Sequence, residues 1–156
     1  MSDTPEYIYK FVDHTLGELE WHEEDSCWET KIPLLGHSVC VDVYAGDGIT
    51  DPSSAQQLEA IATANRYLRE LPLVEQNLRL RAAWEILEAA KNYGLNGSHN
   101  PSECTSDMRL HSLSLHEGGL ALHYRSPGLF PGLTTTVYCR KDFSCTSIEV
   151  YETHGL

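Results

Sequence analysis

The chain has 156 residues, which is enough for one domain with a substantial core. Its 23 acidic side chains against 11 lysines and arginines give a formal net charge of −12, which disfavours nucleic acid as a partner because phosphate backbones bind clustered cations. No apolar run is long enough to span a membrane, and the opening MSDTPEYIYKF lacks the basic and apolar segments of a signal peptide. We therefore expect one globular domain over residues 1–156.

An odd number of cysteines without a secretion signal predicts reduced thiols in a cytoplasm. There are five, none of them in a C-x-x-C motif: Cys27, Cys40, Cys104, Cys139 and Cys145.

The stretch LGELEWHEEDSCWETKIPLLGHSVCVDVY, residues 16–44, predicts two consecutive β-hairpins. A tight turn at Leu35-Gly36 and a polar tip at HEED give both hairpins one common register, and a strand within residues 7–12 is expected to precede them. Period-2 alternation then places seven apolar side chains on a single face. They are Leu19, Trp21, Trp28, Ile32, Val39, Val41 and Val43.

The same register places Glu20, Glu29 and Asp42 in one cross-strand row on the opposite face, with Glu18 in the next row beside Lys31. Adjacent like charges destabilise a sheet unless something compensates them. The row is therefore a candidate site for the basic groups of a partner or for a hard cation. The alternative is an exposed face whose long side chains extend into water.

The hairpin tip, His22, Glu23, Glu24 and Asp25, combines an imidazole with three carboxylates and is a candidate metal site. A solvated turn is the favoured interpretation, because hairpin tips are polar and no EF-hand spacing is present.

Two central helices are expected next. TDPSSAQQL predicts a helix start with Asp51 as N-cap, Pro72 is expected to end that helix, and a second helix runs to Gly94. The apolar pattern of the second helix is broad enough to include Leu80 and Trp84, so we expect it to be buried on more than one side. Residues 96–106 are expected to form a loop.

Two further hairpins follow. They comprise residues 107–116 with 120–126, and residues 134–139 with 145–152. If Lys141-Asp142-Phe143 is the turn of the second, Cys139 faces Cys145, and we expect both to stay reduced. The predicted fold is α+β: an N-terminal antiparallel β-meander, two central helices and C-terminal antiparallel strands.

Catalytic motifs are scarce. The sequence has no G-x-S-x-G elbow, no H-E-x-x-H and no phosphate-binding glycine loop, and nothing indicates a cofactor. His111 and His123 lie on strands that are expected to pair, but zinc needs three or four converging ligands.

The hairpin pattern of residues 16–44, followed by TDPSSAQ and the run LHSLSLHEGGLALHYRS, resembles a group of uncharacterised bacterial domains of unknown function. The resemblance implies two helices between two sets of strands, and an immunity-like role beside bacterial toxins. It implies no catalytic residues. The segment LGHSVC is less acidic than the group's pattern, and five cysteines are unusual for it.

Two functions follow as hypotheses. The first is a non-enzymatic cytoplasmic binding protein whose acidic surface masks a basic protein partner. The alternative is a metal-binding or hydrolytic enzyme that uses carboxylates and histidines of the first sheet. A deep pocket with converging histidines and acids would favour the enzyme, whereas an acidic face without a pocket would favour binding. The oligomeric state is left open.

Overall fold

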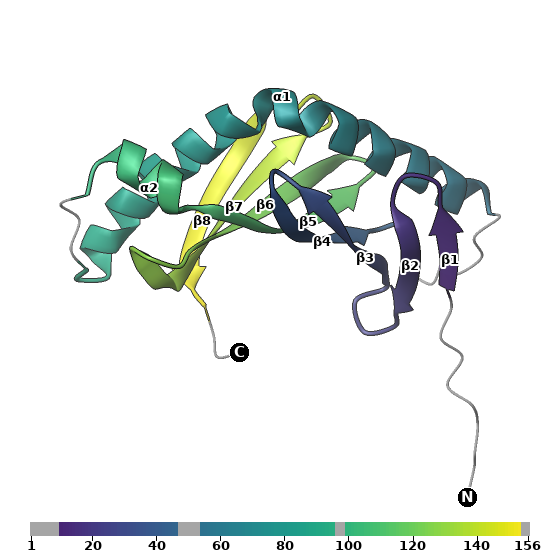
Figure 1. Ribbon diagram of the computed structural model, residues 1–156, viewed down its shortest axis with the longest axis horizontal. Coiled ribbons are helices and arrows are strands. Elements are labelled where there is room, and N and C mark those ends of the chain that lie inside the picture. Colours follow the sequence, from purple (N-terminus) through teal and green to yellow (C-terminus); the bar gives the residue numbers. More distant parts are fainter. Residues whose placement is uncertain (1–9, 47–53, 96–98, 154–156) are drawn as a thin grey trace, which may run out of the picture.

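The computed structural model describes residues 10–46, 54–95 and 99–153. Its strands form one eight-stranded sheet, in which the spatial order β1 to β8 follows the order of the sequence (Figure 1). The strands are β1 Lys10–Asp13, β2 Gly17–His22, β3 Cys27–Leu34, β4 His37–Val43, β5 Arg109–His116, β6 Gly119–Ser126, β7 Phe130–Arg140 and β8 Cys145–Glu152.

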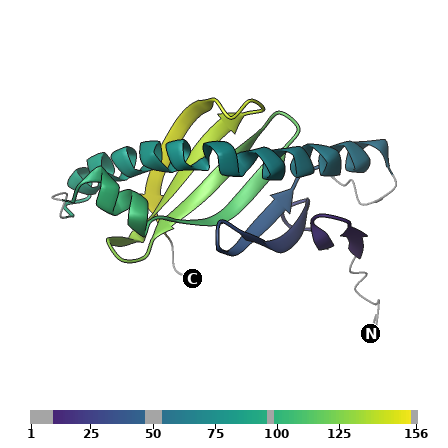
Figure 2. The same cartoon turned by 45° about the horizontal axis from the view of Figure 1, so that its top comes forward.

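Two helices connect β4 to β5. The long helix α1, Ala55–Asn92, lies across one face of the sheet, and the short helix α2, Pro101–Asp107, lies beside the C-terminal half of α1 (Figure 2). The fold is thus α+β in the predicted order. The two groups of strands are not separate layers, however, because β4 and β5 pair in parallel and join them into one sheet.

The predicted register of the first two hairpins is confirmed. Trp21 pairs with Trp28, which pairs in turn with Val43, and Ile32 pairs with Val39. Both turn residues of the second hairpin have positive φ, 53° at Leu35 and 85° at Gly36, as a two-residue hairpin turn requires.

The prediction that Pro72 ends a helix is wrong, because α1 continues through it. Pro72 itself is exposed. Leu68, Leu71 and Leu78 are buried on the same side before and after it. A break would separate these contacts from the sheet, and their burial outweighs the roughly 3 kcal/mol that a proline costs inside a helix.

Both helix starts differ from the prediction. The N-cap of α1 is Ser54, whose Oγ accepts from the Gln57 amide at 3.1 Å, while Asp51 lies outside the described residues. Residues 101–107 form α2 rather than a loop, because the Asn100 side chain caps the Glu103 amide at 2.8 Å and a proline follows at the first helical position. No helix in the described ranges is long and apolar enough to cross a membrane.

The core lies between α1 and the facing side of the sheet. One cross-strand row there runs from Val41 through Leu113, Leu122 and Val137, each of which is fully buried. Trp28 is equally buried and meets Phe11 edge to face, with ring centroids 4.7 Å apart. The opposite, open face of the sheet is not covered by either helix (Figure 1).

Candidate functional site

The acidic row predicted from the sequence is present on the open face. Glu20 pairs with Glu29, and Glu29 pairs with Asp42. Lys10 of β1 lies opposite Glu20 at one end of the row, and Ser114 of β5 lies opposite Asp42 at the other. Three carboxylates therefore stand side by side on adjacent strands. We call Glu20, Glu29 and Asp42 the acidic row.

Asp42 is the most perturbed carboxylate of the row. Its pKa is raised to about 6, chiefly by burial and in addition by the charges of Glu29 and Asp25, while His22 opposes the change. Its Oδ1 is buried and has no hydrogen-bond partner among the described residues. Near neutral pH this group holds a charge at a cost, and an incoming cation would lower that cost.

The negative field extends one row further, to Cys27 and Tyr44. The pKa of each is raised to about 12, chiefly by burial, and the carboxylate of Asp42 contributes to both shifts. The Tyr44 ring stacks on His116, with centroids 4.6 Å apart, and so closes this end of the face. An acid, a thiol and a phenol thus all favour their protonated forms, as expected where the local potential is negative.

The hairpin tip and Glu18 lie at the margin of this surface. Glu23, Glu24 and Asp25 are exposed in the turn, and the Glu23 carboxylate accepts from the Trp21 indole N–H at 2.6 Å. His22 Nε2 lies 3.4 Å from Glu29 Oε2, so the tip does reach the acidic row. Glu18 is exposed and pairs with Lys10 at 3.4 Å.

The charge is unevenly distributed along the chain. Residues 10–46 hold eight acidic side chains and two lysines, whereas the described part of α1 and its flanks, residues 54–95, holds five of each sign. Residues 99–153 hold six acidic and four basic side chains, so residues 10–46 carry most of the net negative charge of the described chain.

The geometry does not assemble a metal site in the described part of the chain. No group of three or more His, Cys, Asp or Glu side chains there is close enough to share an ion. Four surface cavities of about 410 to 520 Å³ are lined by residues other than those of the acidic row.

The second half of the open face centres on His123. Its Nε2 lies 3.0 Å from the Ser114 hydroxyl, its Nδ1 lies 2.9 Å from Thr136 Oγ1, and Thr136 contacts the Tyr151 hydroxyl at 3.2 Å. Burial lowers the pKa of His123, and His111 lowers it further, so the ring is neutral at pH 7. A serine and a histidine at this distance resemble a nucleophile and its base, but here a threonine occupies the position of the orienting carboxylate.

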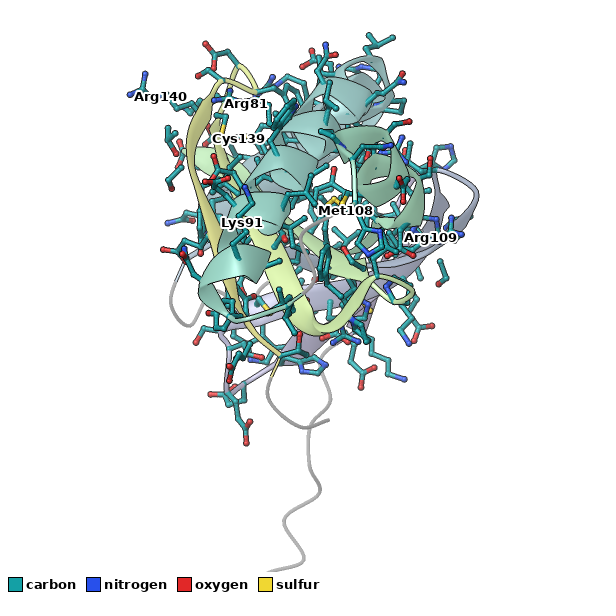
Figure 3. All side chains as sticks on the ribbon, turned by 90° about the vertical axis from the view of Figure 1, so that its left-hand side faces the viewer. Arg81, Lys91, Met108, Arg109, Cys139 and Arg140 are labelled. Carbon is teal, nitrogen blue, oxygen red and sulfur yellow. The ribbon has the colours of Figure 1, made fainter. Side chains whose placement is uncertain are left out.

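The cysteines of the last hairpin face each other, as predicted. Cys139 pairs with Cys145 across β7 and β8. Figure 3 shows Cys139 beside α1, on the same side as Arg81 and Arg140. Burial raises the pKa of Cys139 to about 12, so its thiol is a poor nucleophile. That both remain reduced in the cell stays a prediction, which alkylation at lysis followed by mass spectrometry would check.

Cys27 and Tyr44 were missed as members of the acidic surface, although the register could have found them. His22 pairs with Cys27, and Tyr44 follows Val43, the partner of Trp28. The alternation that places Glu29 and Asp42 on the open face therefore places Cys27 and Tyr44 there too.

Comparison with protein-family models, with curated proteins and with solved structures finds no match for this chain. The candidate site rests on its own geometry.

Proposed function

We propose that this chain is a non-enzymatic cytoplasmic binding protein that masks a basic protein partner with the acidic row and its surroundings. The observation that carries the proposal is Asp42: a partly buried carboxylate with an unpartnered oxygen, held between Glu29 and the second half of the sheet. A lysine or arginine of a partner would supply the missing hydrogen bond and relieve the repulsion.

The shape of the surface supports the same proposal. The acidic side chains lie on a sheet face that neither helix covers, and the surrounding turn adds three more exposed carboxylates. A broad, negatively charged face attracts a positively charged protein over a distance and speeds their encounter. An immunity-like protein, which must capture its target before the target acts, would use such a face.

The test is a calorimetric titration of the protein with an oligo-arginine peptide, carried out at low and at high salt. We expect Glu20→Gln with Glu29→Gln to weaken binding about fivefold or more at low salt and to reduce its salt dependence. The matched control is Glu59→Gln with Glu85→Gln, which removes the same charge from exposed positions on α1. Equal loss in both double variants would show only a general charge effect and would contradict the proposal.

The same titrations with calcium, magnesium and zinc test the metal-binding alternative. A stoichiometric signal that disappears in the Glu20→Gln, Glu29→Gln variant would favour that alternative over partner binding. Activity against ester substrates that is lost in Ser114→Ala would favour the hydrolytic alternative instead, since Ser114 and His123 are the described pair with suitable geometry.

A further inference from the structure

The outward side of α1 carries large apolar side chains that remain exposed in the described chain. Leu73 is 83% exposed, Trp84 61% and Leu80 42%. The sequence pattern predicted that Leu80 and Trp84 would be buried, and that prediction is wrong. Single exposed apolar residues are ordinary, but these three fall on one line along the helix.

The helical repeat shows this alignment. Residues 73, 80 and 84 project within about 40° of one another at 100° per residue, directly opposite the buried side that holds Leu71, Leu78 and Ala82. Figure 2 views α1 from this outward side, where α2 lies beside the helix and not over it. We call Leu73, Leu80 and Trp84 the outer stripe.

The outer stripe is complementary to itself. If a second α1 is laid antiparallel to the first, with the twofold axis between Leu78 and Arg79, Leu73 of one copy meets Trp84 of the other and Leu80 meets Asn77. The same operation places Arg69 opposite Glu88, on both sides of the axis. Both residues are exposed. Arg69 and Glu88 project about 100° apart around the helix, so these long side chains flank the apolar centre and do not lie in line with it.

One pair opposes this arrangement. The axis also places Arg66 opposite Lys91, but each has an acidic neighbour on its own helix: Arg66 lies 3.1 Å from Glu70, and Lys91 lies 3.4 Å from Glu88. These contacts offset much of the repulsion. Because α1 is bowed away from the sheet, the contact is concentrated in its middle turns, where the outer stripe lies (Figure 1).

We propose that the outer stripe docks a second copy of this chain, through an antiparallel α1–α1 contact. The charge distribution favours a copy over another occupant, because α1 is the charge-balanced part of an otherwise acidic protein. Two copies would repel each other if they met through the acidic face of β1–β4 instead. A single helix pair lies at the small end of specific interfaces, so a dissociation constant on the order of 10 µM is expected. The two acidic rows would remain free, on the far layers of the dimer.

Sedimentation velocity over a concentration series tests the dimer. The weight-average mass should rise from 17.5 kDa toward about twice that value. Trp84→Gln should weaken the association at least about tenfold, and its exposed position leaves the fold intact, which a circular dichroism melt would verify. A mass that stays monomeric up to a few hundred micromolar, or a dimer that is unchanged in Trp84→Gln, would overturn the proposal.

Charge reversal tests the antiparallel register. Arg69→Glu alone and Glu88→Arg alone should each remain monomeric, because each places like charges opposite one another twice. An equimolar mixture of the two should form a mixed dimer, since every pair is then opposite in sign. Arg81→Glu mixed with Glu85→Arg is the matched control: both are exposed α1 residues that this axis does not bring together. Failure of the first mixture to dimerise, or equal behaviour of the two mixtures, would overturn the register and with it the proposal.

Discussion

The two halves of the sheet, β1–β4 and β5–β8, are alike beneath α1 and different on the open face. Under the helix, one apolar row passes from Val41 of the first half to Leu113 and Leu122 of the second without a change of character. On the open face, the cross-strand row that contains Glu20, Glu29 and Asp42 continues through β5–β8 as the uncharged residues Ser114, Ala121, Tyr138 and Ser147.

This difference shows that the fold does not require the acidity of the first half. Ser114 and Ala121 occupy the same row of the same sheet without charge, whereas Asp42 beside them is charged, partly buried and incompletely bonded. In the second half, His123 uses both ring nitrogens within its own network. Among the described residues, the buried carboxylate oxygen without a hydrogen-bond partner belongs to the acidic half, which makes that half the better candidate for binding a cationic group.

The largest expected effect tests the likeness of the two halves. Trp28→Ala should lower the free energy of unfolding by about 3–5 kcal/mol, because it empties a fully buried site against Phe11 and Trp21. Leu122→Ala, at a fully buried site in the second half, should cost about 2–5 kcal/mol. Urea unfolding would measure both. A loss below about 1 kcal/mol for either would mean that its half does not share the core.

A buried polar contact gives the next effect. The Tyr124 hydroxyl of β6 donates to Glu75 Oε1 of α1 at 2.9 Å, and Glu75 also lies 3.2 Å from Arg79 Nε. Tyr124→Phe should cost about 1–3 kcal/mol, because it removes a donor from a buried carboxylate. Thermal unfolding would show the loss. An unchanged melting temperature would mean that Arg79 alone satisfies Glu75.

The pH dependence of stability should distinguish the two halves of the sheet, because Asp42 in the first half titrates with a raised pKa. Its folded-state pKa of about 6 lies above the ordinary 3.8, so the folded protein binds this proton more tightly than the unfolded chain does. The cost of the charge is absent below about pH 4 and develops as the pH rises through 6.

Asp42→Asn should therefore stabilise the protein at pH 7 by about 1 kcal/mol, after allowance for solvent screening, and change little near pH 4. Urea unfolding at both pH values measures the difference. Ser114→Ala, in the adjacent position of the row, is the control and should show no such pH dependence. Destabilisation by Asp42→Asn at pH 7 would contradict the inference that the charged Asp42 carboxylate lowers the stability of the folded protein.

The smallest effect concerns the rest of the acidic row. Glu20→Gln with Glu29→Gln should leave stability unchanged or raise it by a few tenths of a kcal/mol, because repulsion between partly exposed neighbours is removed. The same double change is expected to weaken binding of the oligo-arginine peptide, if the proposed function is correct. A clear loss of stability, seen in urea unfolding at low salt, would assign the carboxylates a structural role.

Local patterns in the sequence were enough to predict the first half of the molecule. Alternation around Trp21 and Trp28 fixes which side chains share a face, since a slip of one residue would expose the apolar set. The acidic row follows from the same register. The effect of Asp25 on the pKa of Asp42 does not follow from the register, because it depends on the conformation of the hairpin tip.

Tertiary contacts explain what the sequence did not predict. Pro72 remains helical because the sheet binds α1 on both sides of it, and this cannot be read from local propensity. Trp84 is exposed because the helix has one sheet to pack against and α2 covers only part of the remaining surface. The parallel pairing of β4 with β5 joins residues that are distant in sequence. Alternation within each strand does not predict which strands become neighbours.

We expect this parallel junction to determine the order of folding as well. Six of the seven strand pairs are closed by short turns or loops and form quickly from neighbouring residues, but the contact of Val41 with Leu113 must wait until the whole intervening segment has turned back. In a refolding experiment followed by hydrogen exchange, amides of the β5–β6 and β6–β7 ladders should become protected first. The amides that join β4 to β5 should be protected last, so the seam between the acidic and neutral halves is the rate-limiting closure of the chain.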